Sequence, residues 1–126
     1  IDRLRQLGYD VIEVNFGSKP IKTIYTNKRT EMWHLMAEAI RSGLALPNDN
    51  SLKLELATPT YTFDPSNKIN LESKDDIKKR MPDGASPDIA DALALTYAQT
   101  VAKALPFPVK HSKQDYDPYA QVRAAG

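Results

Sequence analysis

The chain has 126 residues, of which 41% are apolar and 26% are charged, the composition of one soluble globular domain rather than of a disordered chain. Seventeen basic and sixteen acidic side chains leave a formal charge of +1, so any contact with nucleic acid must come from local basic patches. The lack of cysteine excludes disulfide frameworks and thiolate metal sites, and no apolar run approaches the roughly 18 residues of a membrane helix. We therefore expect a cytoplasmic protein without membrane contact.

The N-terminal residues predict a helix, a turn and a strand. Ile1, Leu4 and Leu7 repeat at helical spacing up to Gly8, a good helix terminator. Because the chain starts in mid-helix without a methionine, we expect it to be part of a longer protein. Residues 9–16 then carry β-branched and aromatic residues with alternate apolar positions, which predicts a strand.

The middle of the chain predicts one long helix followed by three strand segments. Residues 26–42 carry apolar residues at i, i+3, i+4, i+7 and i+8, and Gly43 closes this amphipathic helix. Residues 51–57 alternate leucine with polar residues, the period of a strand with one buried face. Residues 60–63 and 68–71 flank an Asp-Pro-Ser-Asn loop, which predicts a β-hairpin.

Two further helices and a tail are predicted after the hairpin. Ser73 can cap a short helix that ends at Arg80, before a Pro-Asp-Gly break. The last helix is expected to begin with Ser86 as N-cap and Pro87 at its first position, and to run to about Ala104. This order of elements predicts an α/β or α+β domain with a sheet covered by helices. Residues 106–126 carry three prolines and no periodicity, which is typical of a flexible tail.

Asp88 and Asp91 are the first candidates for chemistry. They are three residues apart in the first turn of the last predicted helix, so both carboxylates lie on one face and can converge on a divalent cation. Favourable contact with the helix dipole explains the same pattern without a metal. A small-residue stripe of Ala90, Ala94 and Ala98 allows close packing on a sheet, and Asp91 beside it needs a cation or hydrogen-bond donors.

Three separate segments resemble the C-terminal half of the nuclease domain of phage large terminases. They are YTNKRTEMW at residues 25–33, ESKDDIKKR at residues 72–80 and SPDIADALA at residues 86–94. The resemblance covers about residues 1–105, and it implies a ribonuclease-H-like α/β fold, with a mixed sheet flanked by helices and its N-terminal strands missing from this chain. It also implies two Mg²⁺ or Mn²⁺ ions, one activating water and the other stabilising the leaving oxygen of a DNA phosphodiester.

The resemblance maps the last metal-binding acid onto the SPDIAD block, with Asp88 as the first choice and Asp91 as the second. The family's earlier acids lie on strands before the helix in which this chain begins. Asp2, at a frayed helix start, is a poor replacement for them. Since two-metal catalysis needs several fixed carboxylates, we expect this chain alone to bind metal weakly and to cut DNA poorly or not at all.

Basic residues in two clusters are candidates for DNA contact without sequence readout: Lys28, Arg29, Lys74, Lys78, Lys79 and Arg80. The last three suit equally well the negative end of a helix dipole. By resemblance, Lys74 is an active-site neighbour. Met32, Trp33 and Met36 are better explained as core than as a base-stacking platform, and neither His34 nor His111 has the companions of a zinc site.

The expected function is therefore that of a metal-dependent endonuclease that cuts concatemeric phage DNA during packaging, in the cytoplasm of a bacterial host. The implied partners are double-stranded DNA, the portal protein, the small terminase subunit and an N-terminal ATPase motor of the same protein; no phosphate-binding loop occurs in these residues. The alternative is a non-catalytic prophage remnant or a module that docks on DNA, portal or motor. Its contacts would come from the hairpin tip at residues 64–68 and from residues 116–123.

Overall fold

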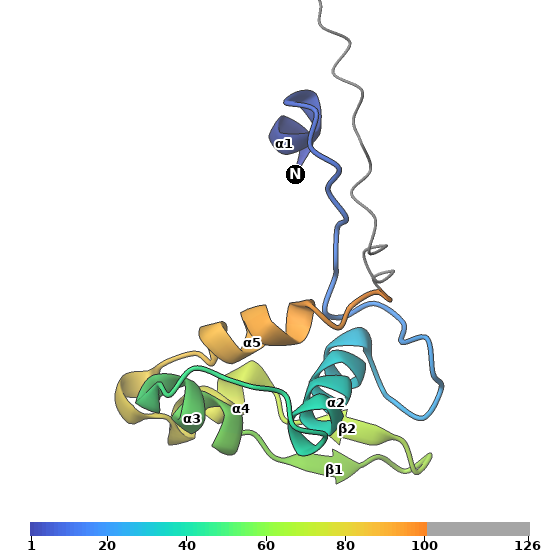
Figure 1. The fold of residues 1–126 in the computed structure, drawn as a ribbon. Helices are drawn as coiled ribbons and strands as arrows, with labels where there is room; N and C mark the ends of the chain where they lie inside the picture. The colour runs from blue at the N-terminus through green and yellow to red at the C-terminus, as the bar shows by residue number, and fades with distance from the viewer. Residues whose placement is uncertain (101–126) are drawn as a thin grey trace, which may run out of the picture.

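The computed structural model describes residues 1–100, and the predicted tail at residues 106–126 lies outside them. These residues form a small mixed α/β domain of helices and one two-stranded antiparallel sheet, which lies at the edge of the domain (Figure 1). Helix α2 (Lys28–Arg41) packs against strand β2 (Ile69–Leu71) and against helix α5 (Asp88–Leu95), which also contacts helix α3 (Asn50–Ala57). Helix α1 (Asp2–Gln6) contacts no other helix or strand of the described part and stands away from them in Figure 1.

Helix α2 is the centre of the core, and the prediction of an amphipathic helix here is confirmed. The Asn27 side chain caps it by accepting a hydrogen bond of 2.9 Å from the Thr30 backbone N–H, and the helix ends before Gly43, whose φ of +98° suits glycine. The predicted core residues Met32, Trp33 and Met36 are all buried, as expected. They pack with residues of α3 and of the chain from α5 onward: Leu52, Ala90, Ala94 and Ala98.

Residues 50–57 form helix α3, so the predicted strand at residues 51–57 is wrong. Asp49 caps the helix by accepting a hydrogen bond of 2.8 Å from the Leu52 backbone N–H. Leu52 and Leu56 are four residues apart and face the core, whereas Leu54 is 44% exposed. Leucine, lysine and glutamate are strong helix formers, and their propensity together with the cap outweighs an alternation that also fits a strand.

The hairpin is confirmed, with Tyr61 opposite Leu71 and Phe63 opposite Ile69 in strands β1 (Tyr61–Phe63) and β2. The Asp64 side chain closes its loop by accepting a hydrogen bond of 2.8 Å from the Lys68 backbone N–H. A single parallel bridge joins Tyr25 to Ile69. The described sheet is therefore small, and it lies against one side of α2 (Figure 1).

The predicted strand at residues 9–16 is also wrong, because this segment pairs with no strand within residues 1–100. Two of its alternating apolar residues, Val14 and Phe16, nevertheless pack against the core. The Phe16 carbonyl accepts a hydrogen bond of 2.9 Å from the Arg29 backbone N–H at the start of α2. The segment is thus an extended loop attached to α2 rather than part of a ladder.

The helices after the hairpin match the prediction in position but not in all boundaries. Ser73 caps helix α4 (Lys74–Arg80), as expected, and a short 3₁₀ turn (Pro82–Gly84) follows. Helix α5 begins at Asp88 and already ends at Leu95. The predicted helix, which was expected to run to about Ala104, is therefore too long. Pro87 is its N-cap rather than its first helical residue, so Ser86 is not the N-cap, and a buried amide in the first turn of α5 donates to a side chain of another helix.

That amide belongs to Ala90, and its partner is Glu55 of α3. The Ala90 backbone N–H donates a hydrogen bond of 2.8 Å to Glu55 Oε2, and Glu55 is buried. A carboxylate at this end of a helix also has a favourable interaction with the helix dipole. This contact between α3 and α5 fixes the start of α5 and so positions the two candidate carboxylates on its first turn.

Candidate active site

Asp91 is the centre of a buried polar cluster formed by three helices. Asp91 is only 4% exposed, and its Oδ1 accepts a hydrogen bond of 2.7 Å from the Trp33 indole Nε1–H. Arg29 Nε, also on α2, lies 3.4 Å from the same oxygen. Lys74, the first residue of α4, places its Nζ 2.6 Å from Asp91 Oδ2. The cluster therefore compensates the buried negative charge with two cations and one neutral donor.

Two buried atoms of this cluster have no hydrogen-bond partner among the described residues: Asp91 Oδ2 and Arg29 Nη2. The Lys74 ammonium nevertheless lies 2.6 Å from Oδ2, so an ion pair compensates this oxygen. Removing one partner of a buried ion pair is strongly destabilising. Lys74 is therefore the group that compensates the charge at Oδ2.

Asp88 lies one turn before Asp91 in a different environment. Its side chain is 76% exposed, and its Oδ1 is 3.9 Å from the same Lys74 Nζ. The two aspartates lie on one face of α5, as their spacing predicted, and both are near one ammonium. Asp88 is open to solvent, whereas Asp91 is buried and held in place by α2.

Arg29 connects this cluster to the end of the hairpin. It donates a hydrogen bond of 2.9 Å from Nη1 to the Glu72 carbonyl, and its guanidinium carbon lies 5.6 Å from the centre of the Trp33 ring. Arg29 is only 8% exposed. The buried guanidinium is already in contact with Asp91 and the Glu72 carbonyl, which favours a role in positioning Asp91 over a role in direct phosphate contact.

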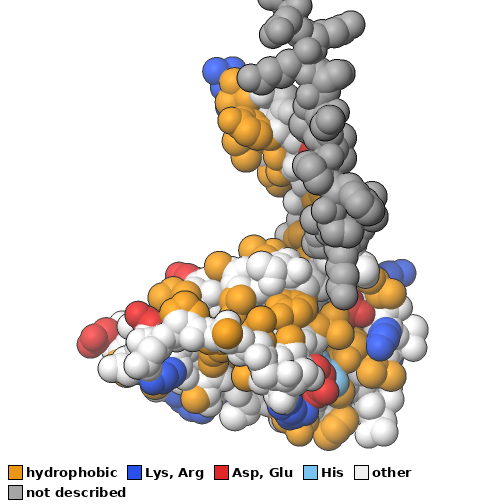
Figure 2. All heavy atoms as spheres, viewed as in Figure 1, with side chains coloured by type: hydrophobic (Ala, Val, Ile, Leu, Met, Phe, Trp, Pro, Cys, Tyr) orange, Lys and Arg blue, Asp and Glu red, His pale blue; other side chains and the backbone are white. Residues whose placement is uncertain are grey.

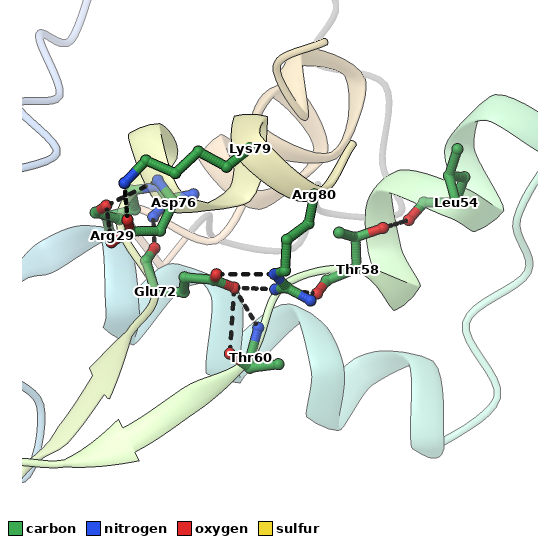
Figure 3. Close-up of polar contacts among 9 residues, drawn as sticks. Arg29, Leu54, Thr58, Thr60, Glu72, Asp76, Lys79 and Arg80 are labelled. Atoms are coloured by element: carbon green, nitrogen blue, oxygen red, sulfur yellow. Dashed lines mark hydrogen bonds and ion pairs between the residues drawn. The ribbon is translucent and has the colours of Figure 1, made fainter. Parts of the chain in front are cut away.

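The Glu72 side chain joins the hairpin to α4 and to the chain after α3 (Figure 3). It receives two hydrogen bonds from the Arg80 guanidinium and two from Thr60, and Arg80 also donates one of 2.8 Å to the Thr58 carbonyl. The hydrogen bonds from Arg80 hold the pKa of the Glu72 carboxyl below its ordinary value. Arg80 therefore fixes α4, the helix that also carries Lys74, against the end of the hairpin.

Lys28 is buried in an ion pair rather than displayed on the surface. Its Nζ donates a hydrogen bond of 2.8 Å to Glu31 Oε2, and Glu31 also accepts hydrogen bonds from the Ile21 and Lys22 backbone N–H groups at 3.0 and 2.9 Å. Burial alone would raise the pKa of Glu31, but these hydrogen bonds outweigh it and lower the pKa. Lys28 and Glu31 fix the loop before α2.

The other predicted basic residues lie on the outer side of α4. Lys78 and Lys79 are exposed in its last turn, where Lys79 pairs with Asp76 at 2.7 Å. On the face shown in Figure 2, basic and acidic side chains intermingle and form no single basic patch. Among the predicted basic residues, Lys78 and Lys79 are the ones whose charges are open to a phosphate without breaking a buried contact.

Asp88 and Asp91 are the carboxylates that could serve as metal ligands here, and they do not make a complete two-ion site. Carboxylate oxygens are the ligands that Mg²⁺ and Mn²⁺ prefer, and Lys74 holds Asp91 Oδ2 in an ion pair. Within residues 1–100, however, no group of three or more histidine, aspartate or glutamate side chains is gathered as metal ligands. Asp2 is on helix α1, away from this cluster. His34 is engaged elsewhere, since its Nδ1 and the Tyr25 hydroxyl form a hydrogen bond of 2.5 Å. His111 lies outside the described residues.

Several residues of the site were missed by sequence reasoning: Glu31, Glu55, Glu72 as a side chain, and the Trp33 indole N–H. The contacts of Trp33 with Asp91 and of Glu55 with Ala90 join residues 58 and 35 positions apart. Local periodicity carries no signal for such pairs. The one available signal was the resemblance, since its three segments supply Arg29, Lys74 and Asp91.

Comparison with protein-family models, with curated proteins and with solved structures finds no match for this chain. No helix within residues 1–100 combines the length and the apolar character needed to span a membrane.

Proposed function

We propose that this chain is the C-terminal part of the nuclease domain of a phage large terminase, with a ribonuclease-H-like fold, and that the complete domain cuts concatemeric DNA during packaging. One observation carries the proposal: the three segments that resemble this family meet around one carboxylate. Trp33 and Arg29 come from the first segment, Lys74 from the second and Asp91 from the third. Segments so far apart in sequence support a shared function best when they build one site.

In the proposed site Asp88 is the first metal ligand, and Asp91, which α2 holds in place, is the second. A divalent ion bound there supplies activation of water and stabilisation of charge on the phosphodiester. Asp88 is exposed and one helical turn from the fixed Asp91, so its carboxylate is presented from a rigid first turn of α5. The further carboxylates that a two-ion site needs are proposed to come from residues that precede Ile1 in a longer protein.

Lys78 and Lys79 are the proposed contacts to the DNA backbone, because they are exposed on the helix that carries Lys74. Such contacts hold DNA without reading sequence, which suits an enzyme that acts on double-stranded DNA of any sequence. The portal protein, the small terminase subunit and an N-terminal ATPase motor are proposed partners of the longer protein, in the cytoplasm of the bacterial host. These partners follow from the resemblance alone.

A second candidate function is a non-catalytic module that docks through the hairpin. Tyr61 and Phe63 are 64% and 60% exposed, and their rings meet edge to face with centroids 6.0 Å apart. They border an apolar cavity between the hairpin and α2 that Trp33, Leu56 and Leu71 also line. Exposed aromatic pairs beside such a cavity are typical of interaction sites.

Cleavage of supercoiled plasmid in Mn²⁺ separates the two functions. The assay uses a chain extended upstream of Ile1 and compares Asp88→Asn with Asp75→Asn, a matched control, because Asp75 is also an exposed aspartate in the first turn of a helix. The nuclease proposal predicts cutting that Asp88→Asn abolishes and Asp75→Asn leaves intact. Intact plasmid with every chain, together with loss of partner binding on Tyr61→Ala, would establish the docking module instead.

A further inference from the structure

Lys74 occupies the position that a bound cation would take between the two candidate carboxylates. Its Nζ is 2.6 Å from Asp91 Oδ2 and 3.9 Å from Asp88 Oδ1, and it lies 5.4 Å from the centre of the Phe16 ring. The ammonium thus forms an ion pair with Asp91 and lies close to Asp88. An ammonium and a divalent ion would therefore use the same oxygens.

The two sides of this ion pair differ in their freedom to move. The Asp91 side chain is 5% exposed and is fixed by Trp33 and Arg29, whereas the Lys74 side chain is 37% exposed and sits on a flexible four-carbon stem. Lys74 also borders an open hollow between α2, the hairpin and α4. The lysine can thus swing into solvent while the carboxylate stays where it is.

We propose that Lys74 is a built-in competitor of the divalent cation: its ammonium neutralises Asp91 and Asp88 in the metal-free protein and must leave before an ion binds them. The inference rests on the proposed function and adds a form of regulation to the same site. It explains how the Oδ2 side of the buried Asp91 carboxylate is compensated without metal, while Trp33 and Arg29 compensate Oδ1. Incoming DNA phosphates offer the released ammonium another anionic partner.

Loss of the ammonium is therefore expected to strengthen metal binding and to make stability depend on metal. In Lys74→Gln the chain should bind Mn²⁺ at least about tenfold more tightly than the wild type. Its melting temperature should fall in EDTA and recover in Mn²⁺, because the ion replaces the lost positive charge. Lys78→Gln is the matched control, as it removes an exposed lysine from the same helix and should change neither property.

The experiment is a titration of the 126-residue chain with Mn²⁺, followed by electron paramagnetic resonance of the free ion, with thermal unfolding measured in parallel. The tighter binding of Lys74→Gln should disappear when Asp88→Asn is added, and Lys74→Arg, which keeps the charge, should bind no more tightly than the wild type. Equal or weaker binding by Lys74→Gln overturns the inference. So does a Lys74→Gln chain that stays unfolded in Mn²⁺.

These outcomes are independent of the test of the nuclease itself. If Lys74→Gln gains no affinity while Asp88→Asn still abolishes cutting by the longer chain, the nuclease proposal stands and Lys74 is only a positioning residue. If the longer chain cuts no DNA but Lys74→Gln binds Mn²⁺ through Asp88, competition is real and the nuclease proposal fails.

Discussion

Replacement of Trp33 by phenylalanine tests whether the indole anchors Asp91. The change removes the 2.7 Å hydrogen bond to Asp91 Oδ1 and leaves a buried carboxylate oxygen with only the longer contact from Arg29. A hydrogen bond to a charged group contributes about 1.5–3 kcal/mol, and the smaller ring loses roughly 1 kcal/mol of packing. The expected loss of unfolding free energy is therefore about 2.5–4 kcal/mol.

The loss is measured by urea unfolding followed by far-ultraviolet circular dichroism, because Trp33 is the only tryptophan and its fluorescence is lost in the variant. A double-mutant cycle with Asp91→Ala isolates the contact and should give a coupling of at least about 1.5 kcal/mol. A loss below about 1 kcal/mol for Trp33→Phe, additive with Asp91→Ala, would refute the anchoring role.

Three further predictions concern the scaffold. Glu55→Ala removes the cap on the Ala90 amide and should cost about 1–3 kcal/mol in urea unfolding, since a buried amide is left without an acceptor. Leu52→Ala should cost about 2–4 kcal/mol but Leu54→Ala much less, because only Leu52 faces the core; equal costs would favour the strand over helix α3. Acid should destabilise the chain through Glu31: its folded pKa is lowered, so its contribution is present above the unfolded pKa and is lost as pH falls through the folded value. Glu31→Gln should flatten stability measured between neutral pH and pH about 3, and an unchanged pH profile would contradict this assignment.

The sequence was sufficient where local signals agree with one another. In α2 the 3.6-residue period, the Asn27 cap and Gly43 all indicate the same helix, and in the hairpin a turn sequence separates two short β-rich runs. In residues 51–57 the leucine alternation fits a strand, but helix propensity and the Asp49 cap favour a helix. The period alone cannot decide between them, because Leu52 and Leu56 share a face in both structures.

The strand predicted at residues 9–16 failed for a different reason. A strand requires a partner, and whether one lies alongside depends on the rest of the fold rather than on the segment itself. Val14 and Phe16 still face the core, but Ile12 is 59% exposed, so the alternation predicted the buried positions only in part and did not predict pairing.

The candidate site shows the same division between local and long-range information. Spacing placed Asp88 and Asp91 on one helical turn, but it could not show that one is exposed and the other is buried against Trp33 and Arg29. Likewise, Lys28 and Arg29 look in the sequence like Lys78 and Lys79, yet the first two are buried beside carboxylates. The partner of Arg29 lies on another helix, which no local pattern encodes, whereas Lys28 pairs with Glu31 three residues later in α2, and only the burial of that pair was hidden from the sequence.

The most direct test of the central claim is the ratio of plasmid cleavage rates in Mn²⁺ for Asp88→Asn and Asp75→Asn in the upstream-extended chain. If Asp88 presents a metal-binding carboxylate from the first turn of α5, the Asp88→Asn rate should fall at least about a hundredfold below that of Asp75→Asn, as expected for loss of several kcal/mol of transition-state stabilisation. Equal rates for the two variants would contradict the claim.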